Sequence, residues 1–374
     1  MKSITILVLH LQHGGIERQT VSMANELAKS YSVSIISTYS MLAPPAYEVS
    51  PDVSVKYLID GKPNREAFLD SVRSFRVFSA IKEGIRSVSI LRRKKRLMIR
   101  EVKKTSSDCL FSTRLEFAEI LSRYAPEGVV RITQEHVCRM SGKYARSVSN
   151  AMRGIDRLVV MTEAAKEFYS SCLGSNGRTE ISVIPNFTDM PRKGAALLGR
   201  HVIAVGRLHP EKNLGALVEA FSKAAEKIPD ADLTIVGDGP ERKKLEDMAL
   251  SSGISDRFRI TGMVSGPEAE KMMRDSDIMV MTSLAECFPM VIIEAFSSGL
   301  PVVAFDVPFG PRSMISDGKN GALVPFGDTD RLASEIVSLL EDRQRLRSMG
   351  ENALDSASRY SKETVMPLWM ALFG

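Results

Sequence analysis

The sequence has few cysteines and none of the local spacing that cysteine chemistry uses. Its 374 residues contain four cysteines, and no two of them form a CxxC pair. Structural zinc sites and disulfide-rich folds both depend on several cysteines at regular spacings. The sequence therefore argues against a disulfide framework and against a cysteine zinc site, and it suits a protein of the reducing cytosol.

Long apolar runs are also absent. No stretch approaches the roughly 18 uninterrupted apolar residues that a membrane-spanning helix needs. The apolar segment at the start of the chain is shorter than this and runs into Gly14 and Gly15. We interpret it as a first strand, and we expect neither a signal peptide nor a transmembrane helix.

Several catalytic and cofactor motifs are missing. Without the fingerprint G-x-G-x-x-G, a nicotinamide or flavin site is not indicated. No G-x-S-x-G elbow and no paired-carboxylate arrangement marks a hydrolase. Three D-x-D triplets occur, but the first two precede expected strands and the third opens a helix. We interpret all three as structural and predict no metal and no cofactor.

Charge is divided unevenly along the chain. Residues 1–194 hold 30 Lys+Arg against 19 Asp+Glu, and the remainder holds 20 against 26. The two parts therefore carry +11 and −6, which sum to the overall +5. A basic half of this kind indicates contact with something anionic.

Apolar runs alternate with amphipathic stretches throughout the chain. This alternation predicts an α/β protein with two doubly wound, Rossmann-like domains facing one cleft. The domains are expected at 1–190 and 200–358, because residues 188–200 lack periodicity and carry Pro and Gly as a linker would. The expected strands are 4–9, 33–37, 108–113, 129–133, 157–161 and 181–184, then 201–205, 233–236, 258–262, 278–282 and 302–305.

The stretch 282–306, TSLAECFPMVIIEAFSSGLPVVAFD, places two glutamates eight positions apart. Proline is tolerated in the first turn of a helix and glycine suits a left-handed cap, so a helix is predicted from Pro289 to Gly299. The free amides at its start could hold an anion. Glu286 lies just outside that end and Glu294 inside it. The alternative is an amphipathic helix with two solvated glutamates.

Two cations are placed to complete such an anion site. Arg207 follows an expected strand, and Lys212 precedes the next helix. Together they would clamp a diphosphate and stabilise a departing nucleoside diphosphate without a metal. Glu294 would then take a ribose diol, and Glu286 the hydroxyls of an attached sugar. This set describes transfer of a glycosyl group from a nucleotide-sugar.

The first half adds a glycine loop and a histidine. Gly14 and Gly15 permit close approach of the backbone to the same phosphates, although a plain tight turn would use them too. His136 follows the strand 129–133, where α/β proteins form ligand sites. It could bind a substrate hydroxyl or orient a phosphate, and a structural role is the alternative.

The stretch 64–104 is strongly basic. It holds 13 Lys+Arg against 4 Asp+Glu, with apolar residues near helical spacing. We predict one or two basic amphipathic helices with three alternative roles: a solvated face, contact with anionic lipid or a lipid-linked pyrophosphate, or nucleic-acid binding, which no recognition fold supports. The run RRKKR consists of Arg92, Arg93, Lys94, Lys95 and Arg96.

Taken together, these segments resemble the retaining glycosyltransferases of family 4, which have the two-domain GT-B fold. The resemblance covers most of the chain and is weakest at 38–104, where acceptor recognition lies in that family. It is nearest to enzymes that build capsule, lipopolysaccharide or lipid-linked oligosaccharides. The matching segments are GGIERQTVSMANELAK, VIPNF, VGRLHPEKNL, LTIVGDGPERKKLE, ECFPMVIIEAFSSGLPVVAFD and DGKNGALVPFGD.

The resemblance implies a role for each matching position. Val264 would meet the base through its backbone, and Pro289 stands where many members have glycine. A C-terminal helix at 359–374 would pack back on the first domain. The implied catalytic residues are Glu286, His136, Arg207 and Lys212. The implied donor-binding residues are Gly14, Gly15, Arg207, Lys212, Val264, Glu286, Phe288, Pro289, Met290, Val291 and Glu294.

The implied activity is metal-independent hexosyl transfer with retention. The donor is expected to be a UDP-sugar, and the acceptor a glycan or a polyprenyl-diphosphate-linked sugar in surface polysaccharide biosynthesis. The basic run 92–96 would serve the acceptor or an anionic membrane, so the expected location is cytoplasmic, with a peripheral place on the inner face of the cell membrane. Two alternatives stay open: a non-catalytic binding protein, and a GT-B epimerase or phosphorylase.

Overall fold

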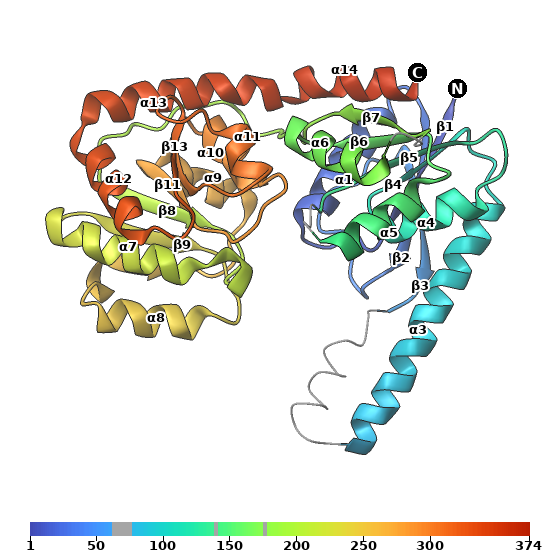
Figure 1. The fold of residues 1–374 in the computed structure, drawn as a ribbon, viewed down its shortest axis with the longest axis horizontal. Coiled ribbons are helices and arrows are strands. Elements are labelled where there is room, and N and C mark those ends of the chain that lie inside the picture. Colours follow the sequence, from blue (N-terminus) through green and yellow to red (C-terminus); the bar gives the residue numbers. More distant parts are fainter. Residues whose placement is uncertain (62–76, 138–140, 175–177) are drawn as a thin grey trace. The chain divides into compact units, whose positions relative to one another are not determined.

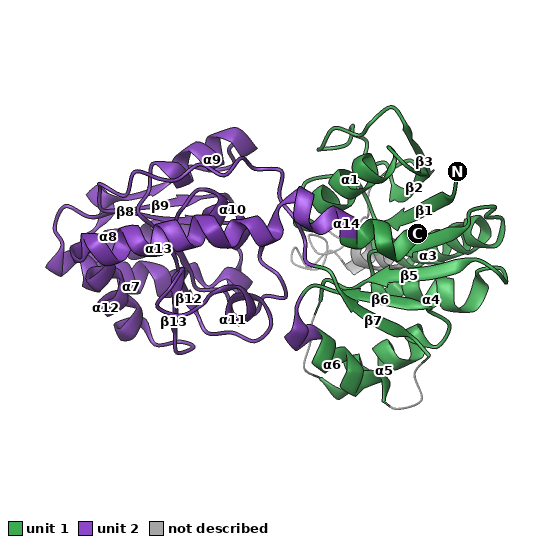
Figure 2. Cartoon of the chain, turned by 90° about the horizontal axis from the view of Figure 1, so that it is seen from above, with its two compact units in different colours: residues 1–161, 166–184, 368–374 green, residues 162–165, 185–367 purple. Residues whose placement is uncertain are grey.

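The computed structural model describes residues 1–61, 77–137, 141–174 and 178–374. The chain divides into two compact units, which Figure 2 colours separately. The sequence prediction divided the chain near residues 190–200 and expected a C-terminal helix at 359–374 to pack back on the first domain; residues 368–374 are the part of it that belongs to unit 1. Unit 1 consists of Met1–Met161, Lys166–Ile184 and Leu368–Gly374, and unit 2 of Thr162–Ala165 and Pro185–Pro367.

Unit 1 is built on a parallel sheet in the order β3-β2-β1-β4-β5-β6-β7. The central strand β1 pairs with β2 on one side, where Ile6 lies opposite Ile35, and with β4 on the other, where Ile6 lies opposite Phe111. Such a strand is covered on both faces, which explains its unbroken apolar run. The strands are β1 (Ser3–Val8), β2 (Ser32–Tyr39), β3 (Val53–Ile59), β4 (Cys109–Ser112), β5 (Val130–Gln134), β6 (Arg157–Val160) and β7 (Glu180–Val183).

Helices connect most of the successive strands of unit 1, whereas β2 and β3 are joined by the non-helical residues 40–52. The helix α3 packs on β3, and α4 packs on β4 and β5. Figure 1 shows α3 as a long helix that extends away from the sheet. The helices between the strands are α1 (Gly15–Leu27), α3 (Val77–Lys103), α4 (Leu115–Tyr124), α5 (Gly142–Met152) and α6 (Glu163–Leu173).

Unit 2 repeats the architecture with a parallel sheet in the order β10-β9-β8-β11-β12-β13. Its strands are β8 (His201–Val205), β9 (Asp232–Val236), β10 (Phe258–Ile260), β11 (Ile278–Met281), β12 (Val302–Phe305) and β13 (Gly321–Val324). Its helices are η1 (Pro210–Lys212), α7 (Leu214–Lys227), α8 (Arg242–Ser251), η2 (Ser255–Arg257), α9 (Gly266–Arg274), α10 (Met290–Ser297), α11 (Gly310–Met314), α12 (Thr329–Glu341), α13 (Arg343–Ser356) and η3 (Ala357–Tyr360). The structure therefore confirms the predicted α/β class with two Rossmann-like sheets.

The stretch that led the sequence analysis folds as predicted. Pro289 is the N-cap of α10, and Gly299 follows the helix with a φ of 64°. This left-handed conformation favours glycine. The strand β12 coincides with the predicted run 302–305, and all four of its residues are buried.

The predicted linker 188–200 is an ordered part of unit 2. The amide of Lys193 donates to the carbonyl of Ser297 over 2.9 Å, and the amide of Ala195 donates to that of Ser298 over 2.8 Å. Leu197 is buried. The segment lacks periodicity because it satisfies the carbonyls at the end of α10 and belongs to no helix or strand of its own.

The helix α14 (Lys362–Phe373) contributes to both units, because the division falls after Pro367, inside the helix. Within unit 1, the ring of Trp369 meets that of Phe111 edge-on, with 5.5 Å between centroids, and stacks on that of Phe373. Trp369 is fully buried. The end of the chain therefore completes the core that β4 begins.

Two of the cysteines, Cys109 and Cys172, carry free thiols, whereas Cys287 is disulfide-bonded. A single disulfide is not a disulfide framework, but the sequence pattern did not indicate that Cys287 is bonded. Pairing depends on which cysteines the fold brings together, and spacing along the chain does not show that.

Candidate active site

The loop between β8 and α7 carries both predicted cations of unit 2. Arg207 is largely exposed, and its Nη2 donates to Oε1 of Glu211 over 2.6 Å. Lys212 is the last residue of η1, after which Asn213 adopts a left-handed φ of 50° and α7 begins. This turn places the two side chains at the carboxyl edge of the sheet, where ligand sites of α/β proteins form.

Lys212 and Glu286 form the closest charge pair of this loop region. Nζ of Lys212 donates to Oε1 of Glu286 over 2.5 Å, and the two side chains are 24% and 15% exposed. Thr282 Oγ1 also donates to the carbonyl of Lys212 over 3.2 Å. The structure thus brings together a cation and a carboxylate that lie far apart in the sequence.

The backbone around Glu286 is held by the segment that starts α11. The amide of Gly310 donates to the carbonyl of Glu286 over 3.1 Å, and the preceding Phe309 has a φ of 72°. A Cβ on Gly310 would lie 2.6 Å from Cδ of Pro289 and 3.1 Å from Cβ of Glu286. Only glycine permits this close packing, which fixes the approach to α10.

The start of α10 presents the amides that were expected to hold an anion. Pro289 caps the helix without a side-chain hydrogen bond, so the first-turn amides depend on other partners. Phe288 is buried against Tyr360, with 5.7 Å between ring centroids. Met290, Val291 and Glu294 follow on the helix, and all three are partly exposed.

Glycines bring three loops of unit 2 close together at the same edge. A Cβ on Gly237 would lie 1.9 Å from the carbonyl oxygen of Gly206, and one on Gly239 would lie 2.4 Å from that of Leu208. The amide of Gly237 also donates to the carbonyl of Gly262 over 3.1 Å. Val264, the predicted contact of the base, follows in this third loop and is partly exposed.

In unit 1, the Gly-Gly loop leads from β1 into α1. Gly14 has extended backbone, so its conformation does not require glycine. The limited space at this position does require glycine, because a Cβ there would lie 2.1 Å from Oε2 of Glu17. The amide of Gly14 donates to the hydroxyl of Tyr47 over 3.3 Å. The loop, including Gly15, is therefore packed against a carboxylate of its own helix.

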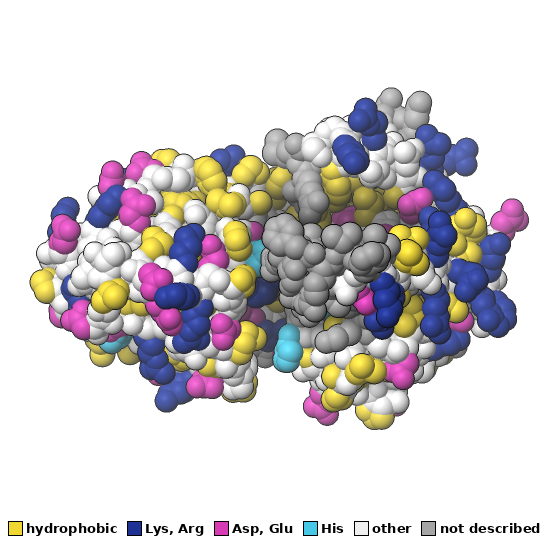
Figure 3. Space-filling view, turned by 90° about the horizontal axis from the view of Figure 1, so that it is seen from below, with side chains coloured by type: hydrophobic (Ala, Val, Ile, Leu, Met, Phe, Trp, Pro, Cys, Tyr) yellow, Lys and Arg dark blue, Asp and Glu magenta, His cyan; other side chains and the backbone are white. Residues whose placement is uncertain are grey.

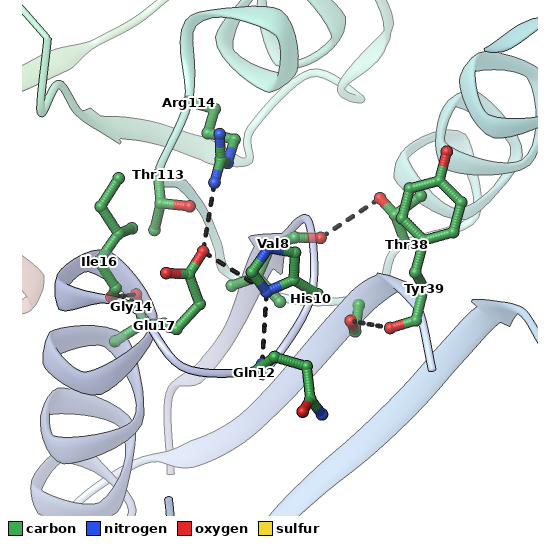
Figure 4. Close-up of polar contacts among 12 residues, drawn as sticks. Val8, His10, Gln12, Gly14, Ile16, Glu17, Thr38, Tyr39, Thr113 and Arg114 are labelled. Carbon is green, nitrogen blue, oxygen red and sulfur yellow. Dashed lines mark hydrogen bonds and ion pairs between the residues drawn. The ribbon is translucent and has the colours of Figure 1, made fainter. Parts of the chain in front are cut away.

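Glu17 is the centre of a charge cluster that the sequence analysis missed (Figure 4). Nη2 of Arg114 donates to its Oε1 over 3.2 Å, and Nδ1 of His10 lies 3.8 Å from the same oxygen. Burial lowers the pKa of His10, and Arg114 lowers it further, against the opposing effect of Glu17. Glu17 itself is buried. The cluster joins the loop after β1, the first turn of α1 and the residue after Thr113.

His136 follows β5, as predicted, next to a buried acid. Burial lowers the pKa of His136 to about 3, with a further contribution from Arg114. Burial raises the pKa of Glu135 to about 8, against the opposing effect of Arg114. Within the described ranges, Nε2 of His136 and Oε1 of Glu135 are buried without a hydrogen-bond partner. At neutral pH the histidine is uncharged and the acid largely protonated.

A signal for these missed residues was present in the sequence. Arg114 comes directly after the expected strand 108–113, and Glu135 directly precedes the histidine that was chosen. Both lie at carboxyl ends of parallel strands. Charged residues in such positions are candidates for a functional site in the same way as His136.

The basic run of α3 is only partly available to a partner. Arg92, Arg93, Lys95 and Arg96 are exposed. Lys94 is buried instead, with Nζ 2.6 Å from Oε2 of Glu116 and 5.6 Å from the ring centroid of Phe117. The assignment of Lys94 to an acceptor or membrane surface is therefore corrected, because helical geometry turns this one side chain toward α4.

Apolar side chains on α3 accompany the exposed cations. Ile85, Val88 and Leu91 are 68%, 46% and 58% exposed, at a spacing that places them near one face of the helix. Figure 3 shows several Lys and Arg side chains gathered along one side of unit 1. Among the described residues, no helix is both long enough and apolar enough to span a membrane.

The acidic triplets have structural partners. Asp277 is buried and accepts hydrogen bonds from the amides of Gly199 and His201, and Asp328 caps α12 by accepting from the amide of Arg331. In the part of the chain that the structure describes, no group of three or more His, Cys, Asp or Glu side chains is arranged to hold a metal. Metal independence stays a prediction.

Comparison with known families agrees with this geometry. Residues 188–355 match the family described as Glycosyl transferases group 1. These residues are similar to the group 1 glycosyl transferases, and the two Rossmann-like sheets are those of the GT-B fold. The match covers the whole charge site of unit 2, from Arg207 to Glu294.

Individual relatives have low sequence identity to the chain. The chain is 30% identical over its full length to the exopolysaccharide phosphotransferase SCO2592 of Streptomyces coelicolor, and 28% identical over 62% of its length to a poly(glycerol-phosphate) alpha-glucosyltransferase of Bacillus subtilis. It spans only 40% and 34% of those proteins. A structure of a TarM mutant from S. aureus, in complex with fondaparinux, alpha-GlcNAc-glycerol and UDP, shares the fold, with a TM-score of 0.78, 15% identity and full coverage of both chains.

Proposed function

We propose that the chain is a retaining glycosyltransferase that moves a sugar from a UDP-sugar to a hydroxyl of a glycan or lipid-linked acceptor in surface polysaccharide biosynthesis. The observation that carries the proposal is the pair of Lys212 and Glu286, with 2.5 Å between Nζ and Oε1, near the amino end of α10. A cation, a carboxylate and free helix amides suit the phosphate and the sugar of one donor. The names of the two relatives, which refer to an exopolysaccharide and to poly(glycerol-phosphate), support the acceptor class.

Each side chain of unit 2 then has a separate partner. Arg207 and Lys212 bind the diphosphate together with the amides around 288–291. Glu294 accepts hydrogen bonds from the ribose, Glu286 from the transferred sugar, and Val264 meets the base through its backbone. The resemblance assigns Gly14, Gly15 and His136 of unit 1 to the same donor, and we keep those roles in the proposal.

The reaction we propose proceeds on one face of the sugar. The acceptor oxygen forms a bond to the anomeric carbon, the bond from that carbon to the phosphate oxygen breaks, and the acceptor proton passes to the leaving phosphate. The new bond forms on the face that the phosphate leaves, so the configuration is retained. The positive charges of Arg207 and Lys212 stabilise the developing diphosphate charge without a metal or another cofactor.

The exposed part of α3 fits the same proposal as a docking surface. Its cations, Arg92, Arg93, Lys95 and Arg96, would approach anionic headgroups or an acceptor diphosphate, while the apolar residues 85, 88 and 91 enter the interface. A cytoplasmic enzyme held at the inner face of the membrane follows from this assignment.

The test is a donor and acceptor assay with product analysis. UDP-glucose, UDP-galactose and UDP-N-acetylglucosamine are each supplied with a polyol-phosphate or glycan acceptor, and UDP release is measured with and without the acceptor. We expect release that depends on the acceptor, and an NMR spectrum in which the product keeps the donor's anomeric configuration. Glu286→Gln should lower kcat by about 100-fold, since it removes a charged contact at the reacting sugar.

The matched control is Glu246→Gln, which changes an exposed glutamate of α8 that pairs with Arg242. It should leave the rate unchanged. An inverted product would refute retention, and full activity of Glu286→Gln would refute the assignment of the site. UDP release that does not require an acceptor would favour a different reaction.

A further inference from the structure

The loop between β12 and α11 is closed by an ion pair of Asp306 and Arg312. Asp306 follows β12, and its amide donates to the carbonyl of Val324 in β13 over 2.7 Å, so this residue is anchored to the sheet of unit 2. Arg312 belongs to α11. Its Nε donates to Oδ1 of Asp306 and its Nη2 to Oδ2, each over 2.7 Å. This bidentate contact, called the fork below, is the geometry in which an arginine holds a carboxylate most firmly.

Between the two partners the backbone makes a strained turn at Phe309. This residue has a φ of 72° and a ψ of −75°, and the amide of Gly310 donates to the carbonyl of Pro308 over 3.1 Å. These features define a classic γ-turn, which is rare and strained for a residue with a side chain. Such strain persists only where the surrounding structure holds it. The turn lies within the residues that the fork encloses, so the fork is placed to hold it.

The turn contacts the candidate site directly through Glu286. Phe309 and Glu286 form an isolated parallel β-bridge, and the amide of Gly310 donates to the carbonyl of Glu286 over 3.1 Å. At the other end of the same residue, Oε1 of Glu286 accepts from Nζ of Lys212 over 2.5 Å. Glu286 is therefore fixed at its backbone by the turn and at its carboxylate by a cation of the loop after β8.

We propose that Asp306 and Arg312 are positioning residues, which hold the γ-turn at Phe309 and through it the backbone of Glu286. The role of this hold in catalysis rests on the proposed function, in which Glu286 contacts the transferred sugar, whereas the hold itself does not. Arg312 is 57% exposed and Asp306 30%. Exposed ion pairs usually contribute little, but those with bidentate geometry are an exception.

The proposal predicts which kinetic constant depends on the fork. Arg207, Lys212 and Glu294, to which the proposed function assigns the diphosphate and the ribose, lie outside the loop that the fork closes. A displaced Glu286 therefore slows the transfer of the sugar more than it weakens the binding of the donor, because the reacting groups lose their alignment while the other contacts remain.

Hydrogen exchange followed by mass spectrometry tests the hold without any activity. Arg312→Gln should speed exchange in residues 307–312 by about tenfold, because the amide of Gly310 loses its fixed acceptors. Arg312→Lys keeps the charge but cannot form the fork, so it should resemble Arg312→Gln. The matched control is Arg200→Gln, which breaks a contact of 2.7 Å with Asp230 at the opposite edge of the same sheet and should change nothing here. Unchanged exchange in Arg312→Gln overturns the proposal.

Glycine at the turn gives a second test. Glycine adopts positive φ without steric cost, so in Phe309→Gly the turn no longer depends on the fork. The increase in exchange caused by Arg312→Gln should therefore be smaller in the Phe309→Gly background than in the wild type. Comparing one substitution in two backgrounds cancels the loss of the phenyl ring's own contacts. Equal increases in both backgrounds would show that the fork does not act on the turn.

Kinetics with the donor and acceptor test the role in catalysis. For Arg312→Gln we expect kcat to fall about tenfold while the donor KM changes by less than about twofold, and adding Phe309→Gly should restore part of the loss. A higher KM with an unchanged kcat overturns the positioning role. If the wild type turns over no donor, the proposed function fails, but exchange in residues 284–288 still decides whether the turn holds the backbone of Glu286. Arg312→Gln should speed exchange there too, and the absence of this effect overturns the hold.

Discussion

The two units use the same kind of parallel sheet but arrange charge differently at its carboxyl edge. In unit 2, each cation pairs with one acid in a partly exposed loop, as Lys212 does with Glu286 and Arg207 with Glu211. In unit 1, Arg114 pairs with the buried Glu17, and His10 lies beside the same carboxylate. Exposed pairs contribute little and can exchange partners, whereas buried ones are costly to separate. The largely exposed pair of Arg207 and Glu211 is therefore the easier one to exchange for a bound anion, whereas the buried Glu17 is costly to separate from its partners.

Close backbone packing differs between the units in the opposite sense, and it predicts unequal effects of two glycine substitutions. Gly237→Ala in unit 2 places a Cβ 1.9 Å from a backbone oxygen at a φ of 144°, whereas Gly14→Ala in unit 1 meets the end of a flexible glutamate. We expect losses of about 3 kcal/mol and about 1 kcal/mol in the free energy of unfolding. Both are measured by urea unfolding.

The single tryptophan separates the two effects. Trp369 lies in the core of unit 1, so its fluorescence reports that unit, while circular dichroism reports both. Gly14→Ala should move the fluorescence transition, and Gly237→Ala should move a transition seen mainly by circular dichroism. If Gly237→Ala proves no more damaging than Gly14→Ala, the contrast between rigid and adaptable packing is wrong.

A smaller effect is expected from the basic surface, which belongs to unit 1 alone. Changing Arg92, Arg93, Lys95 and Arg96 together to Gln should weaken binding to vesicles of phosphatidylglycerol and phosphatidylcholine by at least about tenfold, because each nearby cation contributes roughly 1 kcal/mol. Cosedimentation at low and at physiological salt measures this. Lys94→Gln should instead lower stability, since its ion pair with Glu116 is buried on the lysine side.

The control is the same number of exposed cations in unit 2, namely Lys243, Lys244, Arg331 and Arg347 changed to Gln. Vesicle binding should not respond to them. Equal loss in both variants would mean that net charge alone drives the contact. If the wild-type protein does not bind vesicles, the exposed side of α3 is a solvated face.

The smallest effect concerns pH. The pKa of Glu135 is raised in the folded protein to about 8, so the folded state binds more protons than the unfolded one between about pH 4.5 and 8, and stability falls as pH rises. The lowered pKa of His136 has the opposite effect between about pH 3 and 6.5. The two slopes offset each other below pH 6.5, and only that of Glu135 remains above it.

Glu135→Gln should remove that remaining slope. Between pH 6.5 and 7.5 the wild type is expected to lose about 1 kcal/mol relative to the variant, which is somewhat below the limit of about 1.4 kcal/mol for one proton over one pH unit. Urea midpoints followed by Trp369 fluorescence provide the measurement. Parallel curves for the two proteins would show that Glu135 is ionised throughout this range.

The sequence analysis was most accurate where turn and helix-capping preferences determine the backbone around the candidate site. The helix after Pro289, the left-handed Gly299 and the strand β12 follow from turn and capping rules, and these place Glu286 and Glu294. The sequence could not establish the contact between Lys212 and Glu286, because it joins loops that are distant in the sequence.

Other features escaped because no local pattern encodes them. The edge strand β3 is buried only at its two ends and is interrupted by Ser54 and Lys56, so it was not predicted. Lys94 lies in a run of five cations, and only the orientation of α3 distinguishes it from its neighbours. Arg114 pairs with Glu17, which lies on another segment far away in the sequence. In each case the deciding interaction is tertiary.

The path of α14 has a consequence for biosynthesis. Trp369 and Phe373 belong to the core of unit 1, yet they leave the ribosome after all of unit 2 has been made. Domains generally fold as units in the order of their synthesis. Here the first unit to emerge has to wait for the last residues before Phe111 is covered, so unit 2 can reach its final core before unit 1 does.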